Sequence, residues 1–337
     1  MAHGGQVWQG RGPEAWLDFS ANIRPEGAPD WVREALALGG QYVGYYPDIR
    51  MDAPREGLAL GLGIPPECVL PTPGGAAAID LACRAATGDA LVLDPAFAEY
   101  ERAAKRRGRG VMRAPYGEMG AVKKALFPGA TVWLNNPNNP TGSAWDRPRI
   151  IKLLEATESA GGTLIVDEAF IWYCPQHSVA DLVAAHPALI VVGSLTKILG
   201  IPGARLGYIC AHPDIITKIE VFVLPWHLNC YAAAVASAFG FYPAASEQEQ
   251  KTNEGRRAWL TKALSSLGAY VYPSEANFVL ISMMRYAETI AGRLKDRGLL
   301  VRQCMDFKGV DDGFHLRLAI KDQPENERLV RELEAVL

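Results

Sequence analysis

The sequence predicts an α/β fold, with a large domain built on a mostly parallel sheet between helices and a smaller α+β domain. Short, nearly continuous apolar runs alternate with helical patterns through the middle of the chain, which is typical of parallel sheets covered on both faces. The last third instead mixes strands with amphipathic helices. A length of 337 residues suits one large domain plus a small one.

Apolar runs rich in β-forming residues predict neighbouring strands of the large sheet at 90–94, 131–134, 163–167 and 189–193. Helical patterns follow two of these runs, at 97–107 and at about 147–160. Polar motifs stand directly after the strands, and open α/β sheets bind their ligands at the carboxyl ends of strands. We therefore expect a ligand site along this edge.

The C-terminal third predicts the small domain. Its expected helices lie at 247–267, near 286–297 and at the C-terminus, and its expected strands at 270–272, 278–281, 299–302 and 314–318. We expect the segment 1–40 to pack with this domain, the large domain to span 41–245, and the small domain to span 246–337.

Composition excludes several classes of function. The net charge of −3 gives no electrostatic reason to expect binding to nucleic acid or to an anionic membrane. The six cysteines are scattered without metal-ligand spacing, so we expect no metal site and a reducing cytoplasm. We expect neither a signal peptide at the N-terminus nor a membrane-spanning segment, because the sequence has no matching apolar stretch. The basic run 105–109 is expected to be a solvated helix end.

Lys197 is the main candidate for a catalytic residue. A hydroxyl stands three residues before it, at Ser194, and an arginine eight residues after it, at Arg205. A pyridoxal phosphate site needs this set, because the amine forms a Schiff base while the hydroxyl and the guanidinium hold the phosphate. The sequence therefore predicts an enzyme with pyridoxal 5'-phosphate as cofactor.

A glycine turn at 73–79 leads into a helix of small residues. The free N–H groups of such a helix start, around Gly75 and Ala76, can approach an anion closely. Alone this motif favours an ordinary glycine-started helix. Together with Ser194 and Arg205 it favours a phosphate site.

Two polar motifs follow neighbouring apolar strands. The loop 136–142 is made rigid by two prolines and a glycine, and the amide of its Asn139 can donate to a phenolate oxygen. Asp167 ends the next strand and can pair with a protonated pyridine nitrogen, while Glu168 beside it is expected to be structural. Spacings of 28 residues from Asn139 to Asp167 and 30 from there to Lys197 each match one strand–helix unit.

With these motifs the chain resembles fold-type I pyridoxal phosphate enzymes of the class I/II aminotransferase superfamily over nearly its whole length, which implies a sheet of the seven-stranded type. The resemblance implies catalytic roles for Lys197 and Asp167 and the following cofactor contacts: Lys197 in the Schiff base, Asp167 at the ring nitrogen, Asn139 at the ring hydroxyl, and Ser194, Arg205 and the backbone at Gly75 and Ala76 on the phosphate.

The resemblance also implies contacts outside these motifs. Phe97 is the expected ring-stacking residue, with Tyr100 as the alternative. Tyr46 matches a tyrosine that reaches the phosphate of the neighbouring subunit, which implies a homodimer with shared active sites.

Two branches of the superfamily are similar: threonine-phosphate decarboxylases and histidinol-phosphate aminotransferases. Segments 3–5, 17–23, 225–229 and 300–304 favour the decarboxylases. This implies decarboxylation of L-threonine O-3-phosphate, or of a close phospho-amino acid, to the aminoalkyl phosphate of the cobalamin nucleotide loop. The alternatives are an aminotransferase of the histidinol-phosphate type and, more remotely, a non-catalytic regulator that binds pyridoxal phosphate.

Four residues are candidates for binding the small-molecule substrate. Arg317 matches the superfamily arginine for the α-carboxylate, and a planar guanidinium suits bidentate recognition. Arg302 and His3 are candidates for a substrate phosphate, and Asn22 lies in a segment that resembles the decarboxylases. Arg24 is a further cation that can supply charge near the same place.

The chain departs from the usual patterns at Arg24, Glu26, Gly74, Phe170, Trp172-Tyr173 and Gly193. Phe170 stands where many aminotransferases have a tyrosine that bonds the ring hydroxyl. Glycines 57, 61 and 63 suggest a nicotinamide site as another alternative, but they follow no strand and lack the later ribose-binding acid.

Overall fold

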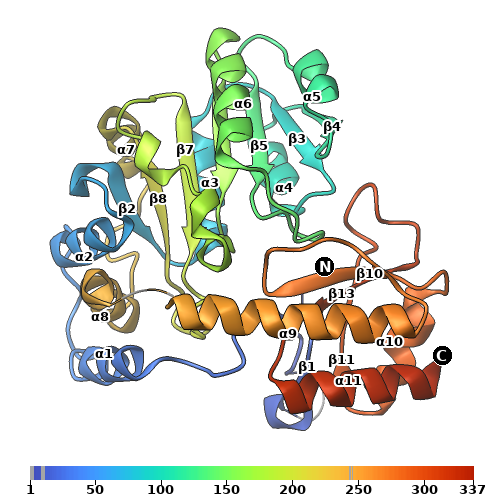
Figure 1. Ribbon diagram of the computed structural model, residues 1–337. Coiled ribbons are helices and arrows are strands. Elements are labelled where there is room, and N and C mark those ends of the chain that lie inside the picture. Colours follow the sequence, from blue (N-terminus) through green and yellow to red (C-terminus); the bar gives the residue numbers. More distant parts are fainter. Residues whose placement is uncertain (1–3, 9–11, 243, 245) are drawn as a thin grey trace.

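The computed structural model describes residues 4–8, 12–242, 244 and 246–337. A large sheet with helices on both faces lies beside a smaller sheet with its own helices, and the long helix α9 (Glu247–Ser266) extends from one part to the other (Figure 1). The predicted fold class, a large α/β domain with a small α+β domain, is confirmed.

The large sheet has seven strands in the spatial order β2 (Val69–Thr72), β8 (Gly207–Ala211), β7 (Leu189–Ser194), β6 (Thr163–Asp167), β5 (Thr131–Asn135), β3 (Ala90–Asp94) and β4 (Val111–Pro115). β8 runs antiparallel to its two neighbours, β2 and β7, and the other neighbouring pairs of this sheet are parallel. The four strands predicted from apolar runs agree with β3, β5, β6 and β7 to within one residue at each end. Pro71 in β2 and Arg113 in β4 weaken the β signal of those two strands.

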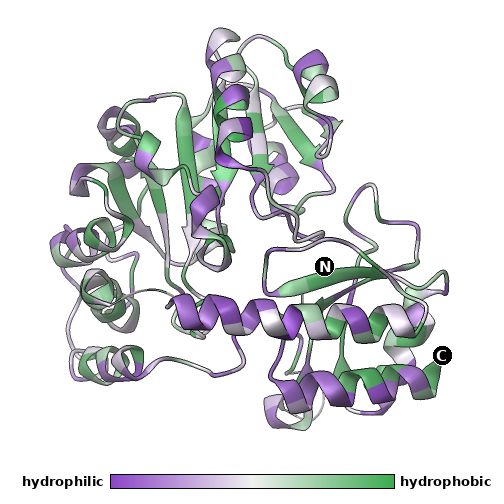
Figure 2. Ribbon diagram, viewed as in Figure 1, coloured by the Kyte–Doolittle hydropathy of each residue, from purple (hydrophilic) through white to green (hydrophobic). Residues whose placement is uncertain are grey.

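Helices cover both faces of this sheet. One face carries α3 (Gly75–Ala85), α4 (Glu99–Lys105) and α7 (Pro213–Glu220), and the other carries α2 (Asp52–Leu62), α5 (Met119–Ala125), α6 (Arg147–Ser159) and α8 (Cys230–Ala238). Successive side chains of β3 point to opposite cores: Leu91 and Leu93 enter one, and Val92 enters the other. Figure 2 shows the resulting pattern, with apolar strands inside and polar helix surfaces outside. Among the helices of the described ranges, none has the length and apolar character needed to span a bilayer.

The small domain contains an antiparallel sheet in the order β12 (Arg302–Gln303), β13 (His315–Ala319), β10 (Phe278–Ser282) and β9 (Tyr270–Val271). The helices α9, α10 (Ala287–Asp296) and α11 (Gln323–Val336) bury apolar side chains against it. The side chains of Ser246 and Glu249 form a reciprocal capping box at the start of α9, which satisfies backbone donors that the helix leaves free. This defines where α9 begins.

The N-terminal segment is divided between the two domains. β1 (Leu17–Asp18) pairs in parallel with β11 (Leu299–Leu300) of the small domain, whereas α1 (Asp30–Gly40) packs against α8 beside the large sheet. The expectation that all of 1–40 packs with the small domain therefore fails for α1. The predicted strand 299–302 is also two short strands, because β11 pairs with β1 and β12 with β13. The domain boundaries stay a prediction.

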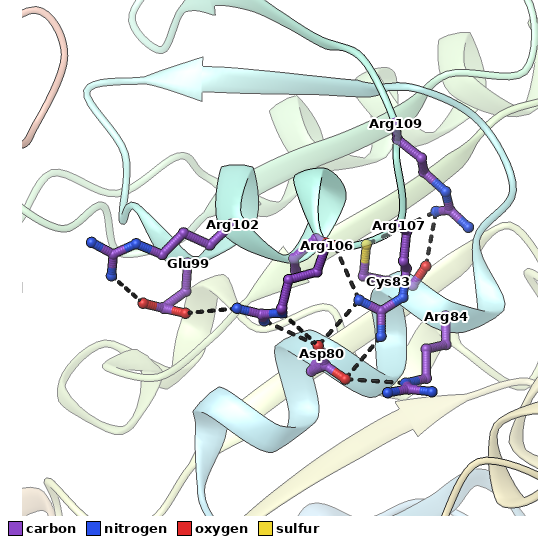
Figure 3. Close-up of polar contacts among 9 residues, drawn as sticks. Asp80, Cys83, Arg84, Glu99, Arg102, Arg106, Arg107 and Arg109 are labelled. Carbon is purple, nitrogen blue, oxygen red and sulfur yellow. Dashed lines mark hydrogen bonds and ion pairs between the residues drawn. The ribbon is translucent and has the colours of Figure 1, made fainter.

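The basic run 105–109 packs the end of α4 on α3. In Figure 3, the guanidinium groups of Arg84, Arg106 and Arg107 converge on Asp80. Burial raises the pKa of Asp80, but the hydrogen bonds from the three arginines outweigh this effect and lower it to about 2. Arg109 donates to the Cys83 carbonyl oxygen at 2.8 Å. The run is thus a partly neutralised helix end.

The nicotinamide alternative is wrong. Gly57 and Gly61 lie inside α2 and follow no strand. A Cβ on Gly57 would lie 2.2 Å from the carbonyl oxygen of Ala236 in α8, and one on Gly61 would lie 2.3 Å from the ring of Phe239. These glycines let two helices approach each other closely.

Gly193 provides a test of packing in the large sheet. It lies opposite Tyr208 on the neighbouring strand, and a Cβ at this position would be 2.1 Å from the Tyr208 Cζ. The Tyr208 side chain is fully buried. We therefore expect Gly193→Ala to lower the free energy of unfolding by about 1–3 kcal/mol, measured by urea denaturation.

Gly203→Ala is the matched control, because a Cβ on Gly203 meets no atom within 4 Å. Its free energy of unfolding should stay within about 0.5 kcal/mol of the wild-type value. Equal stability of the two variants would contradict the packing argument.

Candidate active site

Three strand ends of the large sheet meet at the edge next to the small domain. Asn135 ends β5, Asp167 ends β6 and Ser194 ends β7, and Asn135 and Asp167 are direct neighbours in parallel register. Arg317 of β13 reaches this edge and donates from Nη1 to Asn139 Oδ1. The two domains therefore share one polar site.

A cradle for an anion lies at the start of α3. Gly74 has φ 88°, which favours glycine, and a Cβ there would lie 2.4 Å from Arg205 Nη2. A Cβ on Gly75 would lie 3.1 Å from Ser194 Cβ. The free N–H groups of the first helical turn, at Gly75 and Ala76, thus lie close to a hydroxyl and a guanidinium. This donor set suits a phosphate.

Lys197 lies in the loop that follows β7. Its Nζ donates to Thr196 Oγ1 at 2.9 Å, and that hydroxyl lies 2.8 Å from Ser194 Oγ. Burial lowers the pKa of the Lys197 amine, and the nearby Arg205 and Arg317 lower it further against the opposite effect of Asp167, to about 8. A larger fraction of this amine than of a free lysine is therefore uncharged and nucleophilic near neutral pH.

Asp167 is a buried carboxylate with two hydrogen-bond donors. Tyr100 donates from its hydroxyl to Oδ2 at 2.6 Å, and the Ala169 backbone N–H donates to Oδ1 at 3.0 Å. Burial raises the pKa of Asp167, while these two bonds and the charge of Lys197 act in the opposite direction. Asn135 bonds the Asp167 backbone carbonyl at 2.9 Å and holds the strand end in place.

The loop 136–142 presents Asn139 through local hydrogen bonds. The Asn139 N–H donates to Asn135 Oδ1 at 2.8 Å. Asn138 donates to the Pro95 carbonyl at 2.8 Å and accepts from the Thr141 hydroxyl at 2.8 Å. Asn135 therefore positions both Asn139 and Asp167. It is a site residue that sequence reasoning missed, and its place directly before the loop motif was the available signal.

Arg317 is a buried cation with neutral partners. Its Nη2 donates to the Ser20 carbonyl at 2.9 Å, and its guanidinium lies 5.3 Å from the centre of the Phe278 ring. Burial lowers the pKa of Arg317 to about 10. Within the part of the chain that the structure describes, its Nε has no partner and no carboxylate forms an ion pair with it. A buried charge in this state favours an anionic ligand.

The aromatic residues after β3 have separate roles. Tyr100 is fully buried, and its ring stacks on Trp133 with centroids 4.8 Å apart. It presents no surface to a ligand, so Tyr100 as the alternative ring-stacking residue is wrong. Phe97 is half-buried and packs edge-on against Tyr100. Its stacking role stays a prediction.

Tyr46 is 79% exposed and lines a groove that contains none of the residues described above for the Lys197 site. Its ring stacks on Trp226 at 4.5 Å, and it lines this groove of about 600 Å³ together with other apolar residues. The most exposed of these neighbours are Tyr42, Tyr45 and Phe241. Such a contiguous apolar surface is typical of a protein interface.

Arg302 and Arg317 are cross-strand neighbours in β12 and β13, and both are 6% exposed. Arg302 donates to the carboxylate oxygens of Asp306 at 2.6 and 2.8 Å. Asn22 is buried; its backbone carbonyl accepts from Asn277, and no described residue bonds its Oδ1. His3 lies outside the described residues.

The residues after His3 lie near the Arg317 environment. Gly5 donates its N–H to Ser20 Oγ at 2.8 Å, and a Cβ on Gly4 would be 2.0 Å from the Ser20 carbonyl oxygen. Because that oxygen accepts from Arg317, the start of the described chain packs against a partner of the buried cation. Ser20 is a second residue that the sequence did not single out.

The departures from family patterns have local structural reasons. Arg24 pairs with Glu249 of α9 at 2.5 Å and with Glu26, so the suggestion that it supplies charge to a substrate is wrong. The Phe170 ring packs edge-on against Phe278, and unlike a tyrosine side chain it can donate no hydrogen bond. Trp172 packs on Phe239 in the core beneath the sheet.

Comparison with known proteins agrees with this geometry. Residues 14–333 match the family Aminotransferase class I and II. The chain is 33% identical to the threonine-phosphate decarboxylase of Salmonella typhimurium over 355 residues, covering 100% of this chain and 96% of that protein.

Two solved structures share the fold over 94% of this chain and 98% of each of theirs. The histidinol-phosphate aminotransferase from Clostridium acetobutylicum has a TM-score of 0.85 at 27% identity. The L-threonine-O-3-phosphate decarboxylase from Porphyromonas gingivalis has a TM-score of 0.84 at 26% identity. From the site motifs, the fold and the extent of these matches, we conclude that the chain belongs to the class I and II aminotransferase family.

Proposed function

We propose that this protein is a pyridoxal phosphate-dependent lyase that decarboxylates L-threonine O-3-phosphate, or a close phospho-amino acid, to an aminoalkyl phosphate for the cobalamin nucleotide loop. The observation that carries this proposal is Arg317, a buried guanidinium with only neutral partners among the described residues, bound to Asn139. An amino-acid carboxylate would supply the missing charge. The similarity to the decarboxylase of Salmonella typhimurium supports this choice of reaction.

The residues at the sheet edge fit pyridoxal 5'-phosphate. The proposed contacts are Gly75, Ala76, Ser194 and Arg205 for the phosphate, Lys197 for the aldehyde, Asp167 for the ring nitrogen, Asn139 for the ring hydroxyl and Phe97 for the ring face. The cradle at Gly74 and Gly75, which side chains would fill, supports the phosphate assignment. When bound, the cofactor supplies an aldehyde that reacts with amines and a ring that accepts electrons from the substrate Cα.

The chain's own residues would then orient the reacting bonds. Arg317 would hold the substrate carboxylate, and the hydroxyl of Thr196 orients the Lys197 amine. Asp167 would hold a proton on the ring nitrogen, and this charge would favour departure of the substrate carboxylate as carbon dioxide. Which bond at Cα breaks depends on which one is held perpendicular to the ring.

Arg302 would contact the substrate phosphate. Two buried arginines directly opposite each other on neighbouring strands repel, and Asp306 neutralises only one of them. A substrate with both a carboxylate and a phosphate would balance this charge. Asn22 and His3 stay proposed as further substrate contacts.

The second candidate is an aminotransferase of the histidinol-phosphate type. The fold shared with the enzyme from Clostridium acetobutylicum supports it. In that reaction Lys197 would move a proton from the substrate Cα, and a keto acid would be needed to complete the cycle. A regulator that binds pyridoxal phosphate without catalysis is a remote alternative.

The apolar groove around Tyr46 supports a homodimer. Exposed aromatic side chains cover this surface, and apolar patches of this kind usually pack against another protein surface. The partner copy would bring Tyr46 to the phosphate end of the cofactor. All six cysteines are free thiols, which supports a location in the reducing cytoplasm.

Incubation with O-phosphothreonine in the absence of any keto acid tests the reaction. We expect carbon dioxide and an aminoalkyl phosphate as products, detected by gas release and mass spectrometry, with O-phosphoserine assayed in parallel. Lys197→Ala should abolish both products, and it should also abolish the visible absorbance band of pyridoxal phosphate bound to this lysine. Turnover that requires an added keto acid would favour the aminotransferase. A protein that binds pyridoxal phosphate but converts no substrate would favour the regulator.

Arg317→Lys tests carboxylate binding. An ammonium cannot form the bidentate contact, so we expect kcat/KM for O-phosphothreonine to fall by roughly 10²- to 10³-fold. Steady-state kinetics of carbon dioxide release would measure this. Arg285→Lys is the control, because this exposed arginine of the same domain bonds, within the described ranges, only the backbone carbonyl of Leu337. Equal losses in both variants would argue against a specific role of Arg317.

The lowered pKa of Lys197 predicts a pH-dependent stability of the protein without cofactor. Below about pH 8 the folded protein carries a buried ammonium, which is unfavourable. Between about pH 8 and 10.5 the unfolded chain binds more protons, so the contribution of this lysine becomes less unfavourable as pH rises. Lys197→Met should therefore be more stable than wild type at pH 7, by up to about 3 kcal/mol.

Urea denaturation at several pH values measures this difference, which should shrink as the pH rises above 8. The same change at the exposed Lys262 should leave the free energy of unfolding nearly unchanged throughout. A Lys197→Met variant whose advantage grows with pH would show that the sign is wrong.

A further inference from the structure

Tyr100 joins α4 to the end of β6 through one short hydrogen bond. Its hydroxyl lies 2.6 Å from Asp167 Oδ2, and the two residues are 67 positions apart in the chain. Tyr100 is 0% exposed and Asp167 is 5% exposed. The phenol therefore approaches the carboxylate from the protein interior, while the carboxylate keeps access to the site.

Two aromatic neighbours hold the Tyr100 ring in place. Trp133 of β5 stacks on it with an interplanar angle of 14°, and Phe97 packs against it edge-on at 6.0 Å. Trp133 is itself almost fully buried. The hydroxyl therefore has little freedom to leave the Asp167 carboxylate, and α4 fixes the direction from which it donates.

The carboxylate of Asp167 has room for further donors. A carboxylate offers about four lone-pair positions, and the structure shows one donor on each oxygen, Tyr100 and the Ala169 N–H. The titratable groups that act on its pKa are Tyr100 from α4 and Lys197 after β7, and Asp167 also interacts electrostatically with Tyr208 of β8. Among the described residues no cation forms an ion pair with it, so hydrogen bonds are its main stabilisation.

We propose that Tyr100 is a positioning residue that keeps Asp167 ionised and oriented as the acceptor for the protonated ring nitrogen of the cofactor. This inference rests on the proposed function. A hydrogen bond to the charged form of a buried carboxylate favours that form. Without the phenol, Asp167 would retain one donor in a nonpolar environment and would take up a proton more readily. A neutral carboxylic acid stabilises a protonated ring nitrogen poorly.

Tyr100→Phe tests this role, because it removes the hydroxyl and keeps the ring stack on Trp133. The protein loaded with pyridoxal phosphate is compared as wild type, Tyr100→Phe, Asp167→Asn and the double variant. We expect the Kd for pyridoxal phosphate to rise roughly tenfold in Tyr100→Phe. The visible absorbance of bound pyridoxal phosphate changes with pH. We expect the pH at which this change is half complete, the midpoint, to move in Tyr100→Phe by about one unit toward the midpoint of Asp167→Asn.

The double variant separates direct from indirect effects. If Tyr100 acts through Asp167, the double variant should have the same Kd and the same midpoint as Asp167→Asn alone. Tyr208→Phe is the matched control, because it removes another fully buried phenol that, among the described residues, forms no hydrogen bond to Asp167. It should match wild type in both measurements.

Several outcomes would overturn the inference. These are a Tyr100→Phe variant with the wild-type Kd and midpoint, equal shifts in Tyr208→Phe, and an undiminished effect in the Asp167→Asn background. A wild-type protein that shows no visible band with pyridoxal phosphate would overturn the proposed function, and this inference with it. The first three results leave the proposed function intact.

Trp133→Phe is a second variant for the case that Tyr100→Phe does not fold. It keeps the Tyr100 hydroxyl but narrows the surface on which the Tyr100 ring stacks. We expect a smaller shift of the midpoint in the same direction. A wild-type midpoint and Kd in Trp133→Phe would count against the positioning role. Thermal unfolding of each variant without cofactor reports whether it folds.

Discussion

The parallel register of β5, β6 and β7 is the constraint on which the site depends. It places Asn135 beside Asp167 at the same edge, where the Asn135 side chain bonds the Asp167 carbonyl and the Asn139 N–H. A slip of one residue would turn these side chains to the opposite face of the sheet. The loop, the carboxylate and the lysine after β7 therefore owe their common location to strand pairing.

The charges at this edge are unbalanced in the protein alone. Lys197, Arg205 and Arg317 lie around one buried carboxylate, Asp167, and burial together with the two arginines lowers the pKa of the Lys197 amine. Burial likewise lowers the pKa of Arg317. A cofactor phosphate and a substrate carboxylate would supply the missing negative charge. The excess of positive charge at this edge thus favours the binding of anionic ligands and also helps to keep the Lys197 amine uncharged.

The positions that differ from family patterns are matched by their neighbours. Gly74 leaves space that the Arg205 guanidinium approaches, and Gly193 leaves space that the Tyr208 ring fills. Arg24 gains an ion pair with Glu249 of α9. Each departure changes packing or charge locally, and Arg24 also bonds the loop that contains Lys197, because its backbone N–H donates to the Lys197 carbonyl oxygen at 3.2 Å.

The sequence by itself determined the fold class, four central strands and the residues gathered at the sheet edge, because apolar runs and motif spacing are local signals. It did not indicate that α1 packs on α8, or that β8 runs antiparallel. Only the tertiary structure decided that Tyr100 donates to Asp167 and that Arg24 turns to α9. Such contacts join residues far apart in the chain, and they depend on strand order and side-chain direction, which no local pattern contains.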